Sequence, residues 1–339
     1  MTGRRPPGPA GKGGDAAVAG TAGEAGGALS LEEVMSAVER CAQLSELRPG
    51  VWAGANVVLP GYRRLFGGQL LAQAIGAAAV APPGAGGKVV RSVHLVFTAE
   101  GRPELPVEWS VEAVHDGRTF ATRSVTARQG ERVLAAGVVS LHTPDSGPGV
   151  LSHSAVPPAV RSAADLPAIP QLGAMALELR CELGDGGGEG AHDADAGADG
   201  VPVLDGLAVG PPELAVWMRA HRAPRLGAGG PPAVGAQLAG QQLLAYSSDL
   251  TMMVAAMRPH DGIGFGSPNL LASAVTSHTV SFHQGFAIED WLLFAQSSPV
   301  AAGGRAYIRG DWFTEAGAVV ASCAQEVLIR VAPPQGGTP

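Results

Sequence analysis

Hydrophobic and polar positions along the chain follow one order of elements twice. The run GGQLLAQAIGAAAV, around residue 69, is apolar on nearly all sides and predicts a buried helix that begins at Gly67 and Gly68. A similar run, GQQLLAYSSDLTMMV, lies around residue 242 and predicts a second helix over 241–257. Segments that alternate β-branched and polar residues follow each run, as is typical of strands. The sequence therefore predicts a duplicated unit of one long helix and four or more antiparallel strands.

Short turns separate the predicted strands of the first copy. The turns HDGR and QGE lie between alternating runs, which predicts hairpins and an antiparallel meander. The predicted strands cover residues 89–97, 106–114, 119–128 and 132–142 in the first copy, and 215–220, 279–283, 291–298, 305–313 and 319–331 in the second. Ahead of them, Ser30 and Glu33 form a capping-box pattern that predicts an amphipathic leading helix over Ser30–Leu47. We expect an α+β fold in which a curved sheet wraps each helix and the two sheets lie side by side.

The two copies differ at two core positions. When the copies are aligned on their shared Gln-Leu-Leu-Ala words, Asp249 stands opposite Gly76, and when RVLAAGVVSLH is aligned with AVVASCAQEVL, Gln325 stands opposite Val139. A carboxylate and an amide thus replace apolar residues in the second copy only. This asymmetry indicates one copy for architecture and one for chemistry.

Composition narrows the class of protein. The 339 residues are 46% hydrophobic and 16% charged, which is typical of a globular protein without a transmembrane span. The first residues lack the apolar run of a secretory signal, so we expect a cytoplasmic location. A net charge of −7 without clustered Lys and Arg disfavours a nucleic-acid partner. Three distant cysteines provide neither a metal-binding pair nor a disulfide framework.

Several words in the chain, in this order, resemble the type II acyl-CoA thioesterases. They are RLFGGQLLAQA, VHDGRTFATRSVTA and QGERVL in the first copy, and LLAYSSDL, PHDGIGF, SHTVSFH, DWLLF, RGDWFTEAG and VVASCAQEVLIR in the second. The resemblance implies a double hotdog fold, two helix-in-sheet units in one chain. It implies a first hotdog with its leading helix over 30–143 and a second over 205–332. Around them we expect a disordered tail over 1–29, a partly disordered linker over 144–204 and a short tail over 333–339.

The resemblance also implies a hydrolytic site in the second copy. The family's Asp and Gln match Asp249 and Gln325, and its Thr or Ser position is occupied here by Val275. Thr276 is the candidate hydroxyl if a bulge turns it inward, because a shift of one residue on a strand reverses the face. Ser277 keeps the inward parity and is a second candidate.

The chemistry expected of these residues is activation of a water molecule. Asp249 can accept a proton from water, and the amide of Gln325 can donate to that carboxylate while it accepts from the water. Backbone N–H groups at a helix start, at Gly67 and Gly68 or at Gly240 and Gln241, are candidate donors to the oxyanion. No cofactor and no metal is expected.

The function expected is therefore hydrolysis of an acyl thioester carried by CoA or by a carrier protein, in a homo-oligomer. Two alternatives stay open: a biosynthetic hotdog enzyme for acyl transfer, dehydration or cyclisation, and a non-catalytic acyl-CoA binding protein. The strand histidines are expected to be packed or surface residues; they are His94, His278 and His283. Arg219 and Arg222 are candidates to meet the CoA phosphates, although solvated arginine is the default.

Overall fold

The computed structural model describes residues 30–58, 63–81, 87–144, 152–169, 176–182, 209–225, 232–264 and 270–331. The helices are α1 (Leu31–Ala42), α2 (Gly67–Val80), α3 (Pro232–Ser248) and α4 (Met252–Met257), with a short 3-10 turn at Ala163–Asp165. The strands of the first half are β1 (Ser45–Arg48), β2 (Val51–Gly54), β3 (Val89–Phe97), β4 (Val107–Asp116), β5 (Phe120–Gln129) and β6 (Arg132–His142). Those that follow are β7 (Leu177–Arg180), β8 (Glu213–Ala220), β9 (Leu270–Phe282), β10 (Leu292–Ala302), β11 (Arg305–Thr314) and β12 (Val319–Val331).

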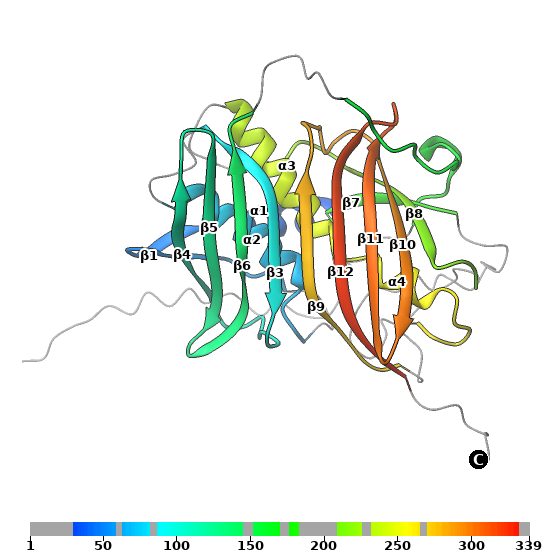
Figure 1. Cartoon of the computed structure of the whole chain (residues 1–339), viewed down its shortest axis with the longest axis horizontal. Coiled ribbons are helices and arrows are strands. Elements are labelled where there is room, and N and C mark those ends of the chain that lie inside the picture. Colours follow the sequence, from blue (N-terminus) through cyan, green and yellow to red (C-terminus); the bar gives the residue numbers. More distant parts are fainter. Residues whose placement is uncertain are drawn as a thin grey trace, which may run out of the picture.

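All of these strands form one antiparallel sheet. Its order is β1-β2-β4-β5-β6-β3-β9-β12-β11-β10-β8-β7, so the two halves mirror each other about the β3–β9 pair (Figure 1). When SVHLVF (92–97) is aligned with SHTVSF (277–282), the pair Ser92–Ser281 corresponds to the pair Ser277–Val96, as a two-fold relation between the copies requires. The predicted duplication and the double hotdog α+β fold are confirmed.

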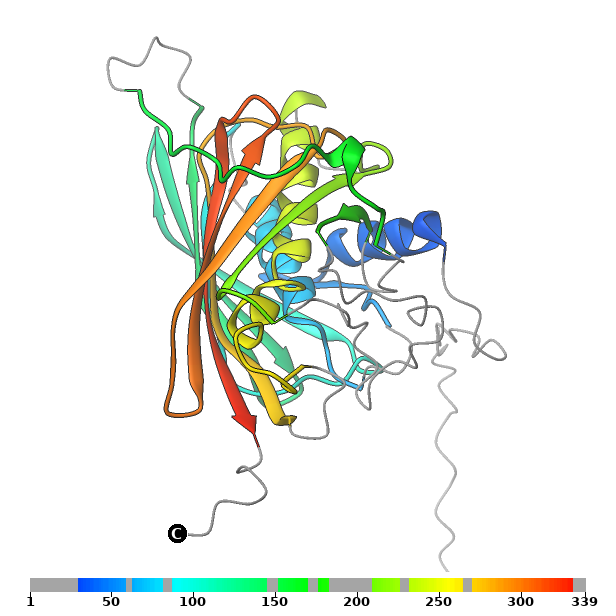
Figure 2. The same cartoon turned by 90° about the vertical axis from the view of Figure 1, so that its right-hand side faces the viewer.

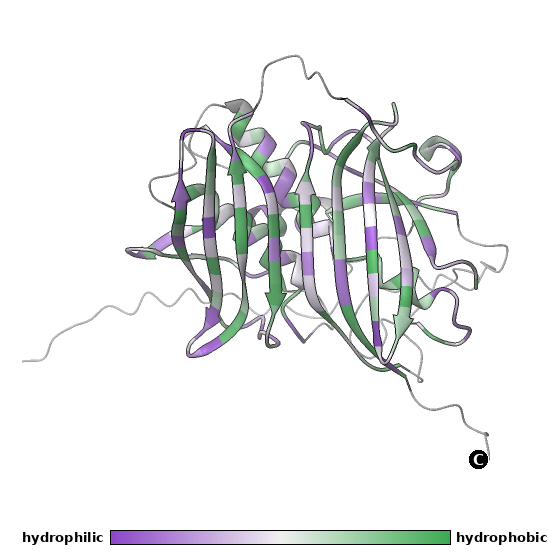
Figure 3. Cartoon of the chain, viewed as in Figure 1, coloured by the Kyte–Doolittle hydropathy of each residue, from purple (hydrophilic) through white to green (hydrophobic). Residues whose placement is uncertain are grey.

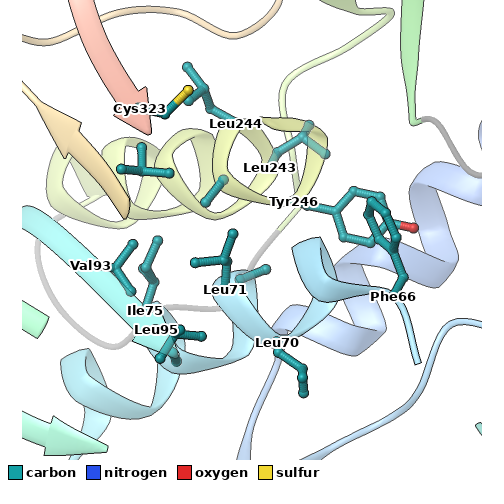
Figure 4. Packing of buried hydrophobic residues seen from close by; sticks show 14 of the residues in the cluster. Phe66, Leu70, Leu71, Ile75, Val93, Leu95, Leu243, Leu244, Tyr246 and Cys323 are labelled. Carbon is teal, nitrogen blue, oxygen red and sulfur yellow. The ribbon is translucent and has the colours of Figure 1, made fainter. Parts of the chain in front are cut away.

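The helices lie on one face of the sheet. Figure 2 shows α2 and α3 between the sheet and α1. Hydrophobic and hydrophilic residues are interspersed along the strands (Figure 3), and buried positions alternate with less buried ones in β5 and in most of β11, as expected of strands with one face on the helices. Where α2 and α3 meet, Leu71 and Ile75 of the first half and Leu243 and Leu244 of the second form one continuous apolar core (Figure 4).

Two details differ from the sequence prediction. The strand β3 pairs with β6 and β9 instead of with β4, so only β4, β5 and β6 form the meander. This placement leaves both edges of β3 paired and joins the halves without an exposed edge between them. The leading helix has the predicted capping box but ends at Ala42 instead of Leu47. Residues 45–48 form β1, which pairs with β2 in an antiparallel hairpin.

The expected tails over 1–29 and 333–339 lie outside the described residues, as does most of the expected linker. Within that linker range, Leu177–Arg180 forms β7 at the edge of the sheet. The domain limits at 143 and 205 stay predictions.

The contact between α2 and α3 allows little room for side chains. A Cβ added at Gly76 of α2 would lie 2.6 Å from Nε2 of Gln242 and 3.0 Å from the backbone oxygen of Ala42. The same Nε2 donates to the backbone oxygens of Ala42 and Ala72, at 3.0 Å each. In contrast, a Cβ at Gly240 of α3 would meet only the ring of Phe286, at 3.6 Å.

We therefore predict opposite effects for two glycine-to-alanine changes. Gly76→Ala should lower the free energy of unfolding by about 1–3 kcal/mol, because overpacking and the loss of the Gln242 bonds outweigh the better helix propensity of alanine. Gly240→Ala should leave stability unchanged or raise it by up to about 1 kcal/mol. Urea unfolding measures both; a Gly76→Ala protein as stable as the Gly240→Ala protein would contradict this packing.

A partly buried cluster of ion pairs connects α1 to the second half of the chain. Arg222, in the segment after β8, donates to Glu39 at 2.6 Å and to Glu32 at 2.8 Å, and the backbone N–H of Arg225 also donates to Glu39. Burial raises the pKa of Glu39, but the bonds from Arg222 and from the Arg225 amide outweigh it, so the net pKa lies below the ordinary 4.5. The side chain of Glu39 is only 10% exposed.

Arg222→Ala should cost about 3 kcal/mol of stability at neutral pH, because it leaves a nearly buried carboxylate without its cation. The Glu39 contribution is present above pH 4.5 and is lost as pH falls through the lowered pKa, so the difference between parent and variant should narrow in acid. The matched control is Arg48→Ala, which removes the exposed pair with Glu108 and should cost much less stability than Arg222→Ala. Urea unfolding at several pH values measures both variants. Equal losses of stability would contradict the stabilising role of the Arg222–Glu39 pair.

Candidate active site

Asp249 lies in a break between two helices, not inside one. The sequence predicts a single helix over 241–257, but α3 ends at Ser248 and α4 starts at Met252. The hydroxyls of Ser247 and Ser248 donate to the backbone oxygens of Leu243 and Ala245, both at 2.8 Å. Such side-chain bonds compete with the helical ladder at its end. The break turns Asp249 away from the α3 ladder and toward the start of α2.

Both oxygens of the Asp249 carboxylate accept hydrogen bonds. Nε2 of Gln325 donates to Oδ1 at 2.5 Å, and the backbone N–H of Gly68 donates to Oδ2 at 3.0 Å. The side chain of Asp249 is 4% exposed, so these donors replace the water that a carboxylate otherwise needs. Gly68 stands in the first turn of α2, whose positive end also favours a negative charge. A Cβ at Gly67 would lie 2.6 Å from Oδ2, so glycine is needed for this approach.

Gln325 reaches Asp249 from β12 and also contacts a histidine. It pairs across the strands with His278 of β9, and its Nε2 lies 3.1 Å from Nδ1 of that ring. The other ring nitrogen of His278 lies 3.1 Å from Oγ of Ser248. Gln325 is 1% exposed and His278 is fully buried. Side chains from α3, β9, β12 and the break after α3 thus form one buried polar network: Ser248, His278, Gln325 and Asp249.

The sequence interpretation of His278 was incomplete. It is packed, as expected, but its ring contacts the pair that sequence reasoning selected. A signal was present, because the repeat alignment places His278 opposite Val93, which is fully buried in the first half. The same comparison had selected Asp249 and Gln325. The other two strand histidines contact hydroxyls, His94 with Thr279 and His283 with Ser322.

The structure does not bring the candidate hydroxyls to Asp249. A bulge is present, because Ser277 pairs with Glu326 and Val275 pairs with Val327, which leaves Thr276 as the extra residue. However, Thr276 is exposed, and its Oγ1 donates to the backbone oxygen of Glu326 at 3.1 Å. The hydroxyl of Ser277 donates to the side chain of Glu326 at 2.9 Å. The bulge therefore turns Thr276 outward, since an unpaired bulge residue is free to face solvent.

Of the two candidate pairs of oxyanion donors, Gly67 with Gly68 lies at a helix start and Gly240 with Gln241 does not. Gly240 and Gln241 lie in the middle of α3, which begins at Pro232, so their N–H groups belong to the helical ladder and the expectation of a helix start there was wrong. At the start of α2, the N–H of Gly68 is directed to Asp249.

The two candidate arginines for CoA phosphates have acidic partners. Arg219 donates to Glu178 at 2.9 Å and lies over the ring of Trp291, and Arg222 belongs to the Glu32–Glu39 cluster.

In the described part of the chain, no group of three or more His, Cys, Asp or Glu side chains is arranged to hold a metal ion. None of the helices that the structure describes is long and apolar enough to cross a membrane.

Both halves of the chain match known proteins. The family described as acyl-CoA thioesterase matches residues 234–328, and the acyl-CoA thioesterase N-terminal domain matches residues 59–142. Acyl-CoA thioesterase 2 of Haemophilus influenzae is 27% identical over 303 residues, which are 88% of this chain and 99% of that protein. Acyl-coenzyme A thioesterase 8 of Mus musculus is 29% identical over 297 residues, covering 86% of this chain and 88% of that protein.

The chain belongs to the type II acyl-CoA thioesterase family. Among solved structures, an acyl-CoA thioesterase II, TesB2, from Mycobacterium marinum matches with a TM-score of 0.64 and 28% identity, over 89% of this chain and all of that one. A hot dog fold protein from Alicyclobacillus acidocaldarius, 19% identical with a TM-score of 0.64, shares the fold. The two family models match one half of this chain each, and the TesB2 structure is matched over its full length.

Proposed function

We propose that the protein hydrolyses acyl-CoA thioesters to a free acid and CoA, with Asp249 as the group that activates water. The observation that carries the proposal is the buried Asp249 carboxylate, held by Gln325 at 2.5 Å and by the Gly68 amide at 3.0 Å. Each carboxylate oxygen has lone pairs beyond the bond it already accepts, so a water molecule can still donate to it. The relatives named as acyl-CoA thioesterases support the same reaction.

The proposed reaction has two steps. In the first, the water oxygen forms a bond to the thioester carbon, the carbonyl π electrons move to the carbonyl oxygen, and Asp249 takes one water proton. In the second, the carbonyl re-forms, the carbon–sulfur bond breaks, and the departing thiolate takes that proton back from Asp249. The products are a carboxylic acid and a thiol, and the enzyme returns to its starting state without a cofactor.

Gln325 has a positioning role in this scheme. One amide proton holds Oδ1 of Asp249, while Oε1 of Gln325 is buried and has no partner among the described residues. This oxygen can accept from the attacking water, which leaves the water with one proton directed to Gln325 and one to Asp249. Retention of both residues favours hydrolysis over acyl transfer or simple binding, because neither alternative needs an activated water.

A homo-oligomer is also proposed. The sheet ends at β1 on one side and at β7 on the other; among the described residues β1 pairs with β2 alone, whereas the outer edge of β7 already forms a bridge from Arg180 to Ala168. Strand edges of this kind are commonly covered by another copy of the chain. Light scattering on the purified protein should give a mass that is a multiple of 34.1 kDa, and a monomer at micromolar concentration would contradict the proposal.

The decisive variant is Asp249→Asn. An amide cannot take the water proton, so kcat for release of free thiol from acyl-CoA should fall by at least about a hundredfold. Thr276→Val should cost much less, because its hydroxyl is exposed and bonded to the backbone of Glu326. Assays over a range of acyl chain lengths measure both, with thermal unfolding as the control for folding. Activity of a folded Asp249→Asn protein close to that of the parent would contradict the assignment, and equal losses would mean that Thr276 moves inward during turnover.

A further inference from the structure

His278 is a buried polar residue that the proposed reaction does not use. It is fully buried on β9, with Ser248 on one side of the ring and Gln325 on the other, each at 3.1 Å. A buried imidazole with partners at both nitrogens has its tautomer fixed by those partners. The hydrogen-bond network around it therefore decides what the ring can do.

The proton positions follow from Ser248. Its Oγ lies 2.8 Å from the backbone oxygen of Ala245, which is only an acceptor, so the single hydroxyl proton is directed there. Oγ must then accept from Nε2–H of His278. A neutral ring with its proton on Nε2 has a lone pair on Nδ1, and this lone pair accepts from Nε2 of Gln325.

Both amide protons of Gln325 are now assigned, one to His278 and one to Asp249. The amide cannot turn over, because Oε1 would then face the carboxylate and the lone pair of the ring. The buried glutamines of the first half differ in this respect. Oε1 of Gln69 accepts from the backbone N–H of Val57, and Oε1 of Gln73 accepts from Trp109. Oε1 of Gln325 has no such partner in the described part of the protein.

From this geometry we propose that His278 is a positioning residue for hydrolysis: with Ser248, it fixes the orientation of the Gln325 amide so that Oε1 is presented to the attacking water. The inference rests on the proposed function and extends it to a residue that touches neither the water nor the thioester. The chain of donors runs from Gln325 through His278 and Ser248 to the α3 backbone. It therefore links the position of Oε1 to the helix end from which Asp249 projects.

The test uses two substitutions at His278. His278→Leu removes the acceptor, so kcat should fall by at least about tenfold while KM changes by less than about twofold, because misplacement of the water affects the chemical step. His278→Asn places an amide oxygen near the position of Nδ1, so it should restore kcat to within about threefold of the parent. A folded His278→Leu protein with the parent kcat, or an Asn variant as impaired as the Leu variant, would overturn the proposal.

Ser248 and Ser247 supply a milder matched pair. Both hydroxyls are buried at the end of α3 and donate to helix carbonyls, but only that of Ser248 contacts His278. Ser248→Ala should lower kcat about fivefold, and Ser247→Ala should leave it within about twofold of the parent. Equal values for the two variants would overturn the proposal even if the His278 variants fail to fold.

Asp249→Asn separates this proposal from the proposed function. If that variant is inactive while His278→Leu and Ser248→Ala keep the parent kcat, water activation at Asp249 stands and the role of His278 fails. If Asp249→Asn itself keeps full activity, the proposed site fails as a whole.

Discussion

A single buried carboxylate, that of Asp249, is held by donors from both halves of the chain. Asp249 comes from the second half, but one of its donors is the Gly68 amide at the start of α2 in the first. The other donor, Gln325, comes from the central part of the sheet on β12. Neither half contains the complete set, so the β3–β9 junction and the close packing of α2 on α3 are requirements of the site as well as of the fold.

A comparison of the two copies explains how the Asp249 carboxylate is accommodated in the interior. A buried carboxylate is unfavourable unless hydrogen bonds replace its water. In the first half Gly76 occupies the equivalent position, where Gln242 and Ala42 leave no room for a side chain. In the second half the helix breaks after Ser248 and the carboxylate meets the start of its neighbour. The two copies therefore differ, one with tight helix packing at this position and the other with a network of hydrogen-bond donors.

The sequence predicted the fold well because hydrophobic periodicity and the internal repeat both act over whole elements. Asp249 and Gln325 could also be selected, since both interrupt an apolar pattern that the other copy preserves, and the resemblance to the thioesterases implied that they belong to one site. The outward turn of Thr276 could not, because a bulge is set by strand pairing and not by local composition. The pairing of β3 with β9 likewise depends on tertiary contacts, and the break at residues 249–251 accompanies serine bonds to the α3 backbone that a hydrophobic pattern does not reveal. His278 was passed over because histidine alone carries little positional information.

The most direct measurement of the central claim is a crystal structure with a non-hydrolysable acyl-CoA analogue in which a methylene replaces the thioester sulfur. We expect a water bonded to both Asp249 and Oε1 of Gln325, with its oxygen about 3–3.5 Å from the carbonyl carbon. A carbonyl bound in another part of the molecule, with no water between it and Asp249, would show that Asp249 does not activate the attacking water.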